Sequence, residues 1–345
     1  MDFLNALVTL ANFVIVPGLA YGAQLALGAL GVTLIYAILR FSNFAHGDTM
    51  AFGTMAAILV TWGFQALGIS FGPLPTALLA LPFAIAITGV FLLGTDRVVY
   101  RFYRAQKAKP VILVIVSLGV MFVMNGLVRF IIGVGDIGFT DGERFIIGAR
   151  DFREWSGLDE GLAIKTTQGI TVVTAVIVMA VLFWFLNKTR TGKSMRAFSD
   201  NEDLALLSGI NPEKVVMVTW LIVAALATTA GVLYGLDKSF KAFTYFQLLL
   251  PIFAAAIVGG IGNPVGAIVG GFVIAFAEVL ITYPLKEVLI TYPLKKVLGY
   301  LLPESLAPSG LVQLLSTDYK FAVSFVILLV VLLFRPTGLF KGQSM

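Results

Sequence analysis

Long apolar segments constrain this chain more than any other feature. A helix needs about 20 apolar residues to cross a membrane, and seven segments qualify by length and composition: 14–39, 49–67, 74–95, 111–133, 169–187, 214–235 and 319–334. Only 12% of the residues are charged, against about 25% in soluble domains. We therefore predict a single all-α domain over 1–345, a polytopic transmembrane helical bundle of about 8–9 membrane segments.

Composition also excludes several classes of function. The chain has no Cys, and its one His is His46. Disulfides and thiolate metal sites are excluded, and we expect no catalytic residues and no metal site. The net charge of +5 fits basic cytoplasmic loops and does not indicate nucleic acid as a partner. No Lys or Arg precedes Arg40, so we expect the first span to be retained and not cleaved as a signal peptide.

The charges of the loops predict the orientation. Residues 96–110 carry five basic residues against Asp96 alone, which favours the cytoplasm. Residues 134–168 carry seven acidic and four basic residues, and one span separates them from that loop, so we expect a periplasmic loop. Residues 188–213 then return to the cytoplasm. Counting spans outward predicts a periplasmic N-terminus and a cytoplasmic C-terminus.

The segment 248–284 is apolar but interrupted. Its first part, 248–260, has 13 residues, about 20 Å as a helix, which is too short to cross. A glycine stop and an Asn-Pro helix start follow. We predict a broken, re-entrant helix pair that turns within the membrane; the alternative is two ordinary, tightly packed helices joined by a glycine turn. The residues at the break are Gly259, Gly260, Gly262, Asn263 and Pro264.

A polar island, 196–212, separates two spans on the predicted cytoplasmic side. Ser199 and Glu202 have the spacing of a capping box, and Gly209 is a typical helix stop. The pattern predicts a short helix over about 199–208 whose leucine face binds a partner. Its candidate coupling residues are Arg196, Ser199, Asp200, Asn201, Glu202, Leu204, Leu207 and Gly209.

Polar residues also follow the first span. Asn43, His46 and Asp48 interrupt the apolar sequence there. They suit a turn in which Asp48 lies near a helix N-terminus, or a role in gating or in contact with a neighbouring subunit. Glu278 is a pathway candidate that could equally extend to the outer interface, which is the position we expect for Arg129.

The tetrapeptide 191–194, Thr-Gly-Lys-Ser, resembles the end of a phosphate-binding loop. The first glycine of that motif is replaced by Asn187, and a membrane span precedes the segment. We therefore expect no nucleotide or other cofactor to bind this chain.

Four motifs together resemble the H-type permease subunit of branched-chain amino acid ABC importers. They are GLAYGAQLALGALGVTLIYAILRFSNFAHGD (18–48), RAFSDNEDLALLSGINPEKV (196–215), AIVGGIGNPVGAIVGGF (256–272) and LLFRPTGLF (332–340). The resemblance implies a bacterial inner-membrane complex with an M-type second permease subunit, two cytoplasmic ATPase subunits that bind ATP and Mg²⁺, and a periplasmic substrate-binding protein. The basic loop 96–110 and the repeat VLITYPLKE/VLITYPLKK (279–296) depart from the family pattern.

The predicted function is import of branched-chain or other small hydrophobic amino acids. Importers of urea or short-chain amides, and of sugars or nucleosides, share these motifs, so the substrate stays open. An ion-coupled secondary transporter is a further alternative, but the spans carry almost no charge. An intramembrane enzyme would need a polar catalytic cluster at depth, which one His does not supply.

Overall fold

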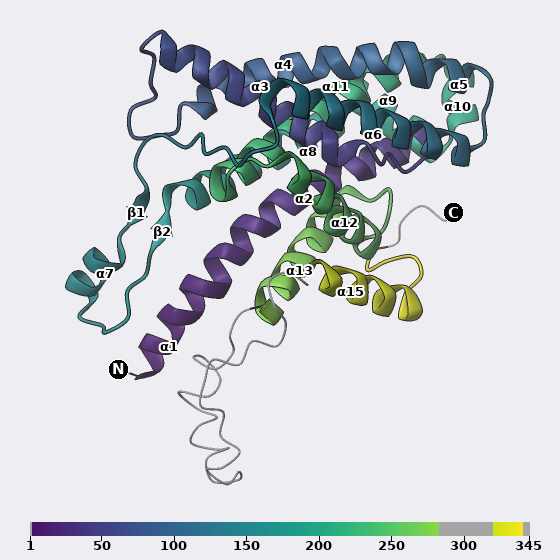
Figure 1. The fold of residues 1–345 in the computed structure, drawn as a ribbon. Helices are drawn as coiled ribbons and strands as arrows, with labels where there is room; N and C mark the ends of the chain where they lie inside the picture. Colours follow the sequence, from purple (N-terminus) through teal and green to yellow (C-terminus); the bar gives the residue numbers. More distant parts are fainter. Residues whose placement is uncertain (1, 283–319, 341–345) are drawn as a thin grey trace.

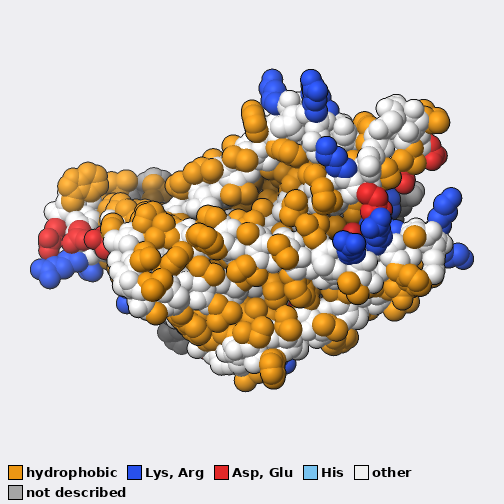
Figure 2. Space-filling model, turned by 90° about the horizontal axis from the view of Figure 1, so that it is seen from above, with side chains coloured by type: hydrophobic (Ala, Val, Ile, Leu, Met, Phe, Trp, Pro, Cys, Tyr) orange, Lys and Arg blue, Asp and Glu red, His pale blue; other side chains and the backbone are white. Residues whose placement is uncertain are grey.

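The computed structural model describes residues 2–282 and 320–340, and most of them form long helices (Figure 1). Within these residues, eight helices are long and apolar enough to cross a membrane, and Phe321–Phe334 is a shorter apolar helix. Hydrophobic side chains cover most of the face seen in Figure 2, as a lipid-facing surface requires. The predicted all-α polytopic fold is confirmed.

The elements follow in chain order, with π-helical turns named η. They are α1 (Asp2–Leu10), η1 (Ala11–Ile15), α2 (Val16–Leu39), α3 (His46–Ala66), α4 (Ala77–Thr95), η2 (Asp96–Tyr100), α5 (Arg101–Ala105), α6 (Pro110–Ile132), β1 (Phe145–Ile147), α7 (Ala149–Ser156), β2 (Ile164–Lys165), α8 (Thr166–Lys188), α9 (Arg190–Asp200), α10 (Glu202–Leu207), α11 (Pro212–Lys238), α12 (Ala242–Gly259), α13 (Pro264–Thr282) and α15 (Lys320–Phe334).

Helix α2 lies at the centre of the bundle. Its sequence is apolar on all sides, and a helix of that kind must be buried by its neighbours; it packs against α8, α11, α12 and α13. Glycines on α2 receive aromatic side chains, since a Cβ at Gly18 or Gly22 would overlap Phe276 or Phe272 of α13. Small residues that admit a neighbour closely are the usual basis of helix packing in lipid.

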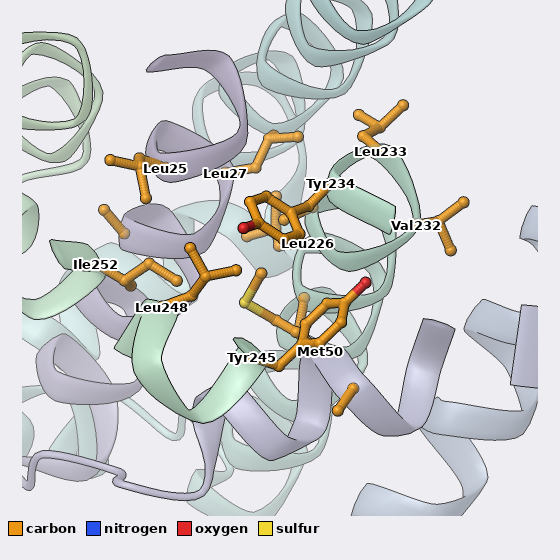
Figure 3. Packing of buried hydrophobic residues seen from close by; sticks show 14 of the residues in the cluster. Leu25, Leu27, Met50, Leu226, Val232, Leu233, Tyr234, Tyr245, Leu248 and Ile252 are labelled. Atoms are coloured by element: carbon orange, nitrogen blue, oxygen red, sulfur yellow. The ribbon is translucent and has the colours of Figure 1, made fainter. Parts of the chain in front are cut away.

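The main hydrophobic core joins α2, α3, α11 and α12 (Figure 3). Tyr245 of α12 is fully buried in it, and its hydroxyl donates to the Gly231 carbonyl of α11 at 2.9 Å. A second core cluster, around Trp220 and Phe198, packs α9 and the start of α11 against the end of α2.

One end of the molecule combines the N-terminal helix with residues 134–168. The side chain of Asn12 donates to the Gly161 carbonyl at 2.7 Å, and Asn5 donates to Asp159 at 3.2 Å. The expected loop contains α7 and the short antiparallel pair β1–β2. Figure 1 places these elements opposite α5, α9 and α10, so the predicted periplasmic and cytoplasmic segments lie at different ends.

Two expected boundaries are wrong. The helix of the first span begins at Asp2, not at 14, and the basic segment 96–110 is largely helical because α4 continues through η2 into α5. The wide π-helical turn η2 begins at Asp96, whose buried carboxylate accepts a hydrogen bond from the Trp220 indole at 2.7 Å. This partner inside the bundle accounts for a helix that continues through charged residues.

The predicted half-helix 248–260 is also wrong. It is the second part of α12, which has 18 residues, about 27 Å of helix. The extra turns begin at Ala242 because Ala242 and Tyr245 are buried. The pair is therefore two tightly packed helices joined by a glycine turn, which is the alternative that the sequence left open.

That turn lies at the α9 end of the molecule. Gly260 and Gly262 adopt positive φ angles of 111° and 88°, which glycine permits without strain. The backbone N–H groups of Leu339 and Phe340 donate to the carbonyls of Val258 and Gly259 at 2.8 and 3.0 Å. The C-terminal segment thus satisfies carbonyl groups at the end of α12. Of the tandem repeat, residues 283–296 lie outside the described residues.

Candidate functional site

Helices α9 and α10 lie together at the surface, and their buried side chains pack against the bundle. Met195 and Phe198 of α9 and Ala205 of α10 are buried. The Arg40 guanidinium at the end of α2 donates to the Ser199 carbonyl at 2.5 Å. Gly192 permits the sharp bend from α8 to α9, because a Cβ there would meet the Phe185 carbonyl oxygen at 2.2 Å. The sequence that resembled a phosphate loop therefore has a packing role.

The helix predicted over 199–208 is wrong in its start. Ser199 and Asp200 complete α9, and the cap of α10 is Asn201, whose side chain accepts from the Leu204 backbone N–H at 3.0 Å. Glu202 is the first residue of α10 and not the partner in a capping box. The stop is as expected, with Gly209 at a φ of 80°. Asn competes well with Ser as a helix cap, and spacing alone did not separate them.

The outward face of α10 is apolar. Leu204 is 61% exposed and Leu207 is 85% exposed, and Leu206 beside them is also exposed. Acidic residues Glu202 and Asp203 occupy the first turn. Rigidly mounted leucines with a charged rim are suited to binding another protein.

Two sets of predicted residues meet beneath this unit. A cavity of about 460 Å³ is bordered by Arg196, Ser199 and Asp200 of α9, by Gly262 and Asn263 of the α12–α13 turn, and by residues of α2. Asn263 caps α13 by accepting from the Gly266 N–H at 3.1 Å. The cavity thus brings α9, the α12–α13 turn and α2 to one place in the molecule. No pattern in the sequence indicated that these residues are neighbours.

Residues Asn43 to Asp48 form the largely buried segment that leads into α3 and its first turn. After Leu39 the chain reverses at Arg40, which has a φ of 57°, and α3 begins at His46 against Gly31 of α2. Gly31 lies about 12 Å, or two turns, before the end of α2. Because α3 begins beside Gly31, the non-helical segment between α2 and α3 leads back into the bundle. The Asn43 side chain accepts from the Ala45 N–H at 3.1 Å and from the Tyr100 hydroxyl at 3.3 Å. As expected, Asp48 lies in the first turn of α3.

Glu278 lies apart from these residues and is 1% exposed. One carboxylate oxygen accepts from the Tyr21 hydroxyl of α2 at 3.0 Å, and the other accepts from Ser324 of α15. An extension of Glu278 to the outer interface is contradicted by this burial. The carboxylate joins three helices beside a cavity of about 240 Å³.

Sequence reasoning missed the surroundings of Asp48. The Asn125 side chain of α6 donates to one Asp48 oxygen at 2.7 Å, and Arg129 borders the same cavity. Arg129 and Asn125 are four residues apart on α6, so their shared face was the available signal. No group of three or more His, Cys, Asp or Glu suited to a metal ion occurs in 2–282 or 320–340.

The sequence of this chain is similar to those of several known membrane permeases. Residues 14–332 match the family described as the permease component of the branched-chain amino acid transport system. The chain is 29% identical to the Escherichia coli K12 high-affinity branched-chain amino acid permease protein LivH, over 93% of this chain and 92% of LivH. It is 27% identical to BraD of Pseudomonas aeruginosa over 94% of each chain. It is 26% identical to the E. coli K12 ribose import permease protein RbsC, over 73% of this chain and 72% of RbsC.

Proposed function

The chain belongs to the family of permease components of branched-chain amino acid transport systems, and from that premise we propose that it is the H-type membrane subunit of an ATP-driven, binding-protein-dependent importer. The substrates are branched-chain or other small hydrophobic amino acids. The observation that carries this proposal is similarity to LivH over 93% of the chain and 92% of LivH, because a match of that length is not confined to one motif.

The surface of α9 and α10 is the proposed contact with a cytoplasmic ATPase subunit. Its exposed leucines, Leu204 and Leu207, stand on a unit anchored by Met195 and Phe198. The cavity beneath it connects this unit to the α12–α13 turn and to α2. Movement of α9 on ATP binding in the partner would be transmitted to the α12–α13 turn and to α2. An ATP-driven importer requires coupling of this kind.

The complex has further subunits. We assign an M-type second permease subunit, two ATPase subunits that bind ATP and Mg²⁺, and a periplasmic substrate-binding protein. The chain spans the bacterial inner membrane with its N-terminus in the periplasm and its C-terminus in the cytoplasm. The basic residues of 96–110 and 188–213 support that orientation, since both segments lie at the end opposite α7.

Uptake in cells tests the substrate. A strain without its own branched-chain amino acid importers, supplied with this chain and its partner subunits, is expected to accumulate radiolabelled leucine. Competition by valine and isoleucine, but not by urea or acetamide, supports the proposal. Accumulation of urea or an amide without leucine would contradict it.

A sugar is the second candidate substrate, because the similarity to RbsC covers 73% of the chain. The same cells decide between the two candidates. Uptake of labelled ribose that leucine does not inhibit would favour the sugar importer.

A further inference from the structure

A cavity of about 240 Å³ lies between α3, α6 and the first turns of α12, at residues that the coupling surface does not use. Its polar lining consists of Asp48, Asn125 and Arg129, and its apolar lining includes Phe122, Phe243 and Phe246. Phe122 and Phe243 are largely exposed, at 71% and 49%, so the cavity opens on the surface of the chain. One acidic group, one basic group and aromatic walls are thus combined in a space the size of a small solute.

Asp48 forms the inner part of this cavity and is fully buried. One of its carboxylate oxygens accepts from Asn125 at 2.7 Å. The other, Oδ2, is buried and has no hydrogen-bond donor among the described residues. Burying a carboxylate oxygen without a hydrogen-bond donor costs free energy. The position of Asp48 in the first turn of α3 is favourable for its negative charge, but it does not provide a hydrogen bond to this oxygen. Asp48 borders the cavity, so a solute that enters it is the available source of a donor for this oxygen.

Arg129 lies at the exposed rim of the same cavity. It forms no salt bridge with Asp48 or with any other acidic residue in the described parts of the chain. Two opposite charges therefore border one cavity without an ion pair between them. A ligand with an ammonium group at one end and a carboxylate at the other would satisfy both.

We propose that this cavity is a binding subsite for a zwitterionic amino acid with an apolar side chain. The α-ammonium group donates to Asp48 Oδ2 and the α-carboxylate accepts from the Arg129 guanidinium. The apolar side chain packs on Met121 and Phe246. The identity of the ligand rests on the proposed function, whereas the two-point recognition of charge rests on Asp48 and Arg129. The site is a transient stop in transport, so weak binding suits it.

Cysteine labelling measures occupancy directly, because the chain has no native Cys. Phe243→Cys places a thiol at the rim of the cavity in the assembled transporter in proteoliposomes. Leucine is expected to slow its alkylation by a small neutral maleimide. The analogues 4-methylpentanoate, which lacks the ammonium group, and 3-methylbutylamine, which lacks the carboxylate, are expected to give little protection at the same concentration.

Variants in the Phe243→Cys background test the assigned partners. Asp48→Asn and Arg129→Gln are each expected to raise the leucine concentration for half-protection by about tenfold or more, because each removes a charge-assisted hydrogen bond. Asp151→Asn, at an exposed position of α7, is the matched control and is expected to leave protection unchanged. If Asp48→Asn fails to assemble, as judged by stimulated ATP hydrolysis, Arg129→Gln decides.

Import of leucine by the same vesicles separates this proposal from the proposed function. Vesicles that import leucine but show no protection, or equal protection by all three compounds, overturn the subsite and leave the importer intact. Vesicles that import another solute, without leucine, refute the proposed function. Protection by leucine that persists in both variants would also overturn the subsite.

Discussion

Asp96 fixes three segments of the chain at one point. Its carboxylate accepts from the Trp220 indole N–H of α11 at 2.7 Å and from both terminal nitrogens of Arg104 on α5. Tyr100 stacks on Trp220 with ring centroids 5.2 Å apart. Charges inside a membrane protein are costly unless paired, and this group is paired on both sides. It determines where the basic helix α5 lies against α11.

Removal of that carboxylate is expected to destabilise the protein. Asp96→Ala leaves the mostly buried Arg104 charge and the Trp220 N–H without an acceptor, at a cost of about 3 kcal/mol. The purified variant should unfold at a lower temperature than the wild-type chain. Asp203→Ala, at an exposed position on α10, is the control. Equal unfolding temperatures for the two variants would show that the Asp96 contacts are not stabilising.

A single leucine tests the docking surface. Leu207→Asp puts a charge where an apolar contact is proposed, and burying it without a partner would cost about 2–4 kcal/mol. The variant should insert normally and lose binding-protein-stimulated ATP hydrolysis. Leu67→Asp changes a leucine that is 76% exposed beyond α3, and it should retain stimulation. Normal stimulation of the Leu207 variant would exclude this surface as the ATPase contact.

Helices α12 and α13 pack with their backbones in close contact. A Cβ at Gly270 would lie 2.0 Å from the Ala255 carbonyl oxygen, and one at Gly266 would lie 2.3 Å from the Gly259 oxygen. These two glycines lie four residues apart and form a flat face on α13. Their contact sets the separation of the two helices beside the turn that borders α9.

Alanine substitution tests this contact. Gly270→Ala is expected to lower stability by about 1–3 kcal/mol, because backbone atoms must move apart. Gly119→Ala on α6 has no neighbour within 4 Å of the new Cβ and should be neutral or slightly stabilising. The two variants are compared by thermal unfolding in detergent. A destabilisation of the same size in both would contradict the close-packing account.

Sequence patterns predicted the helices better than their contacts. Apolar length located the spans, and Asn263 caps α13 as expected. Local patterns did not reveal that α12 extends back to Ala242, since the burial of Tyr245 depends on α11. Local patterns also did not reveal that Asn201 is the cap of α10, because this depends on α9 continuing to Asp200. Local patterns also did not show that Arg129 borders the same cavity as Asp48, because the two residues are distant in sequence.

The whole molecule has two chemically different ends. The N-terminal helix meets residues 134–168 at one end, and the C-terminal segment meets the α12–α13 turn at the other. In Figure 2, most of the visible Lys and Arg side chains lie in the right half of the face, and a smaller group at the left edge lies beside Asp and Glu side chains. This distribution supports the orientation proposed from the loop charges.

Labelling from each side of the membrane tests that orientation. The chain has no native Cys, so single cysteines can be introduced. Trp155→Cys, at a position on α7 that is 85% exposed, should react with an impermeant reagent from the periplasm. Ser305→Cys should react from the same side. Ser208→Cys, beside α10, should react only from the cytoplasmic side. Labelling of Ser305→Cys only from the cytoplasm would rule out the expected path of the chain after α13.

The central claim is that this chain couples ATP hydrolysis by partner subunits to import. The most direct measurement is ATP hydrolysis by the reconstituted complex of both permease subunits and both ATPases, with and without leucine-loaded binding protein. Stimulation by the loaded binding protein, together with leucine accumulation that an ionophore does not abolish, is the predicted result. Leucine accumulation that requires an ion gradient and proceeds without ATP would contradict the account.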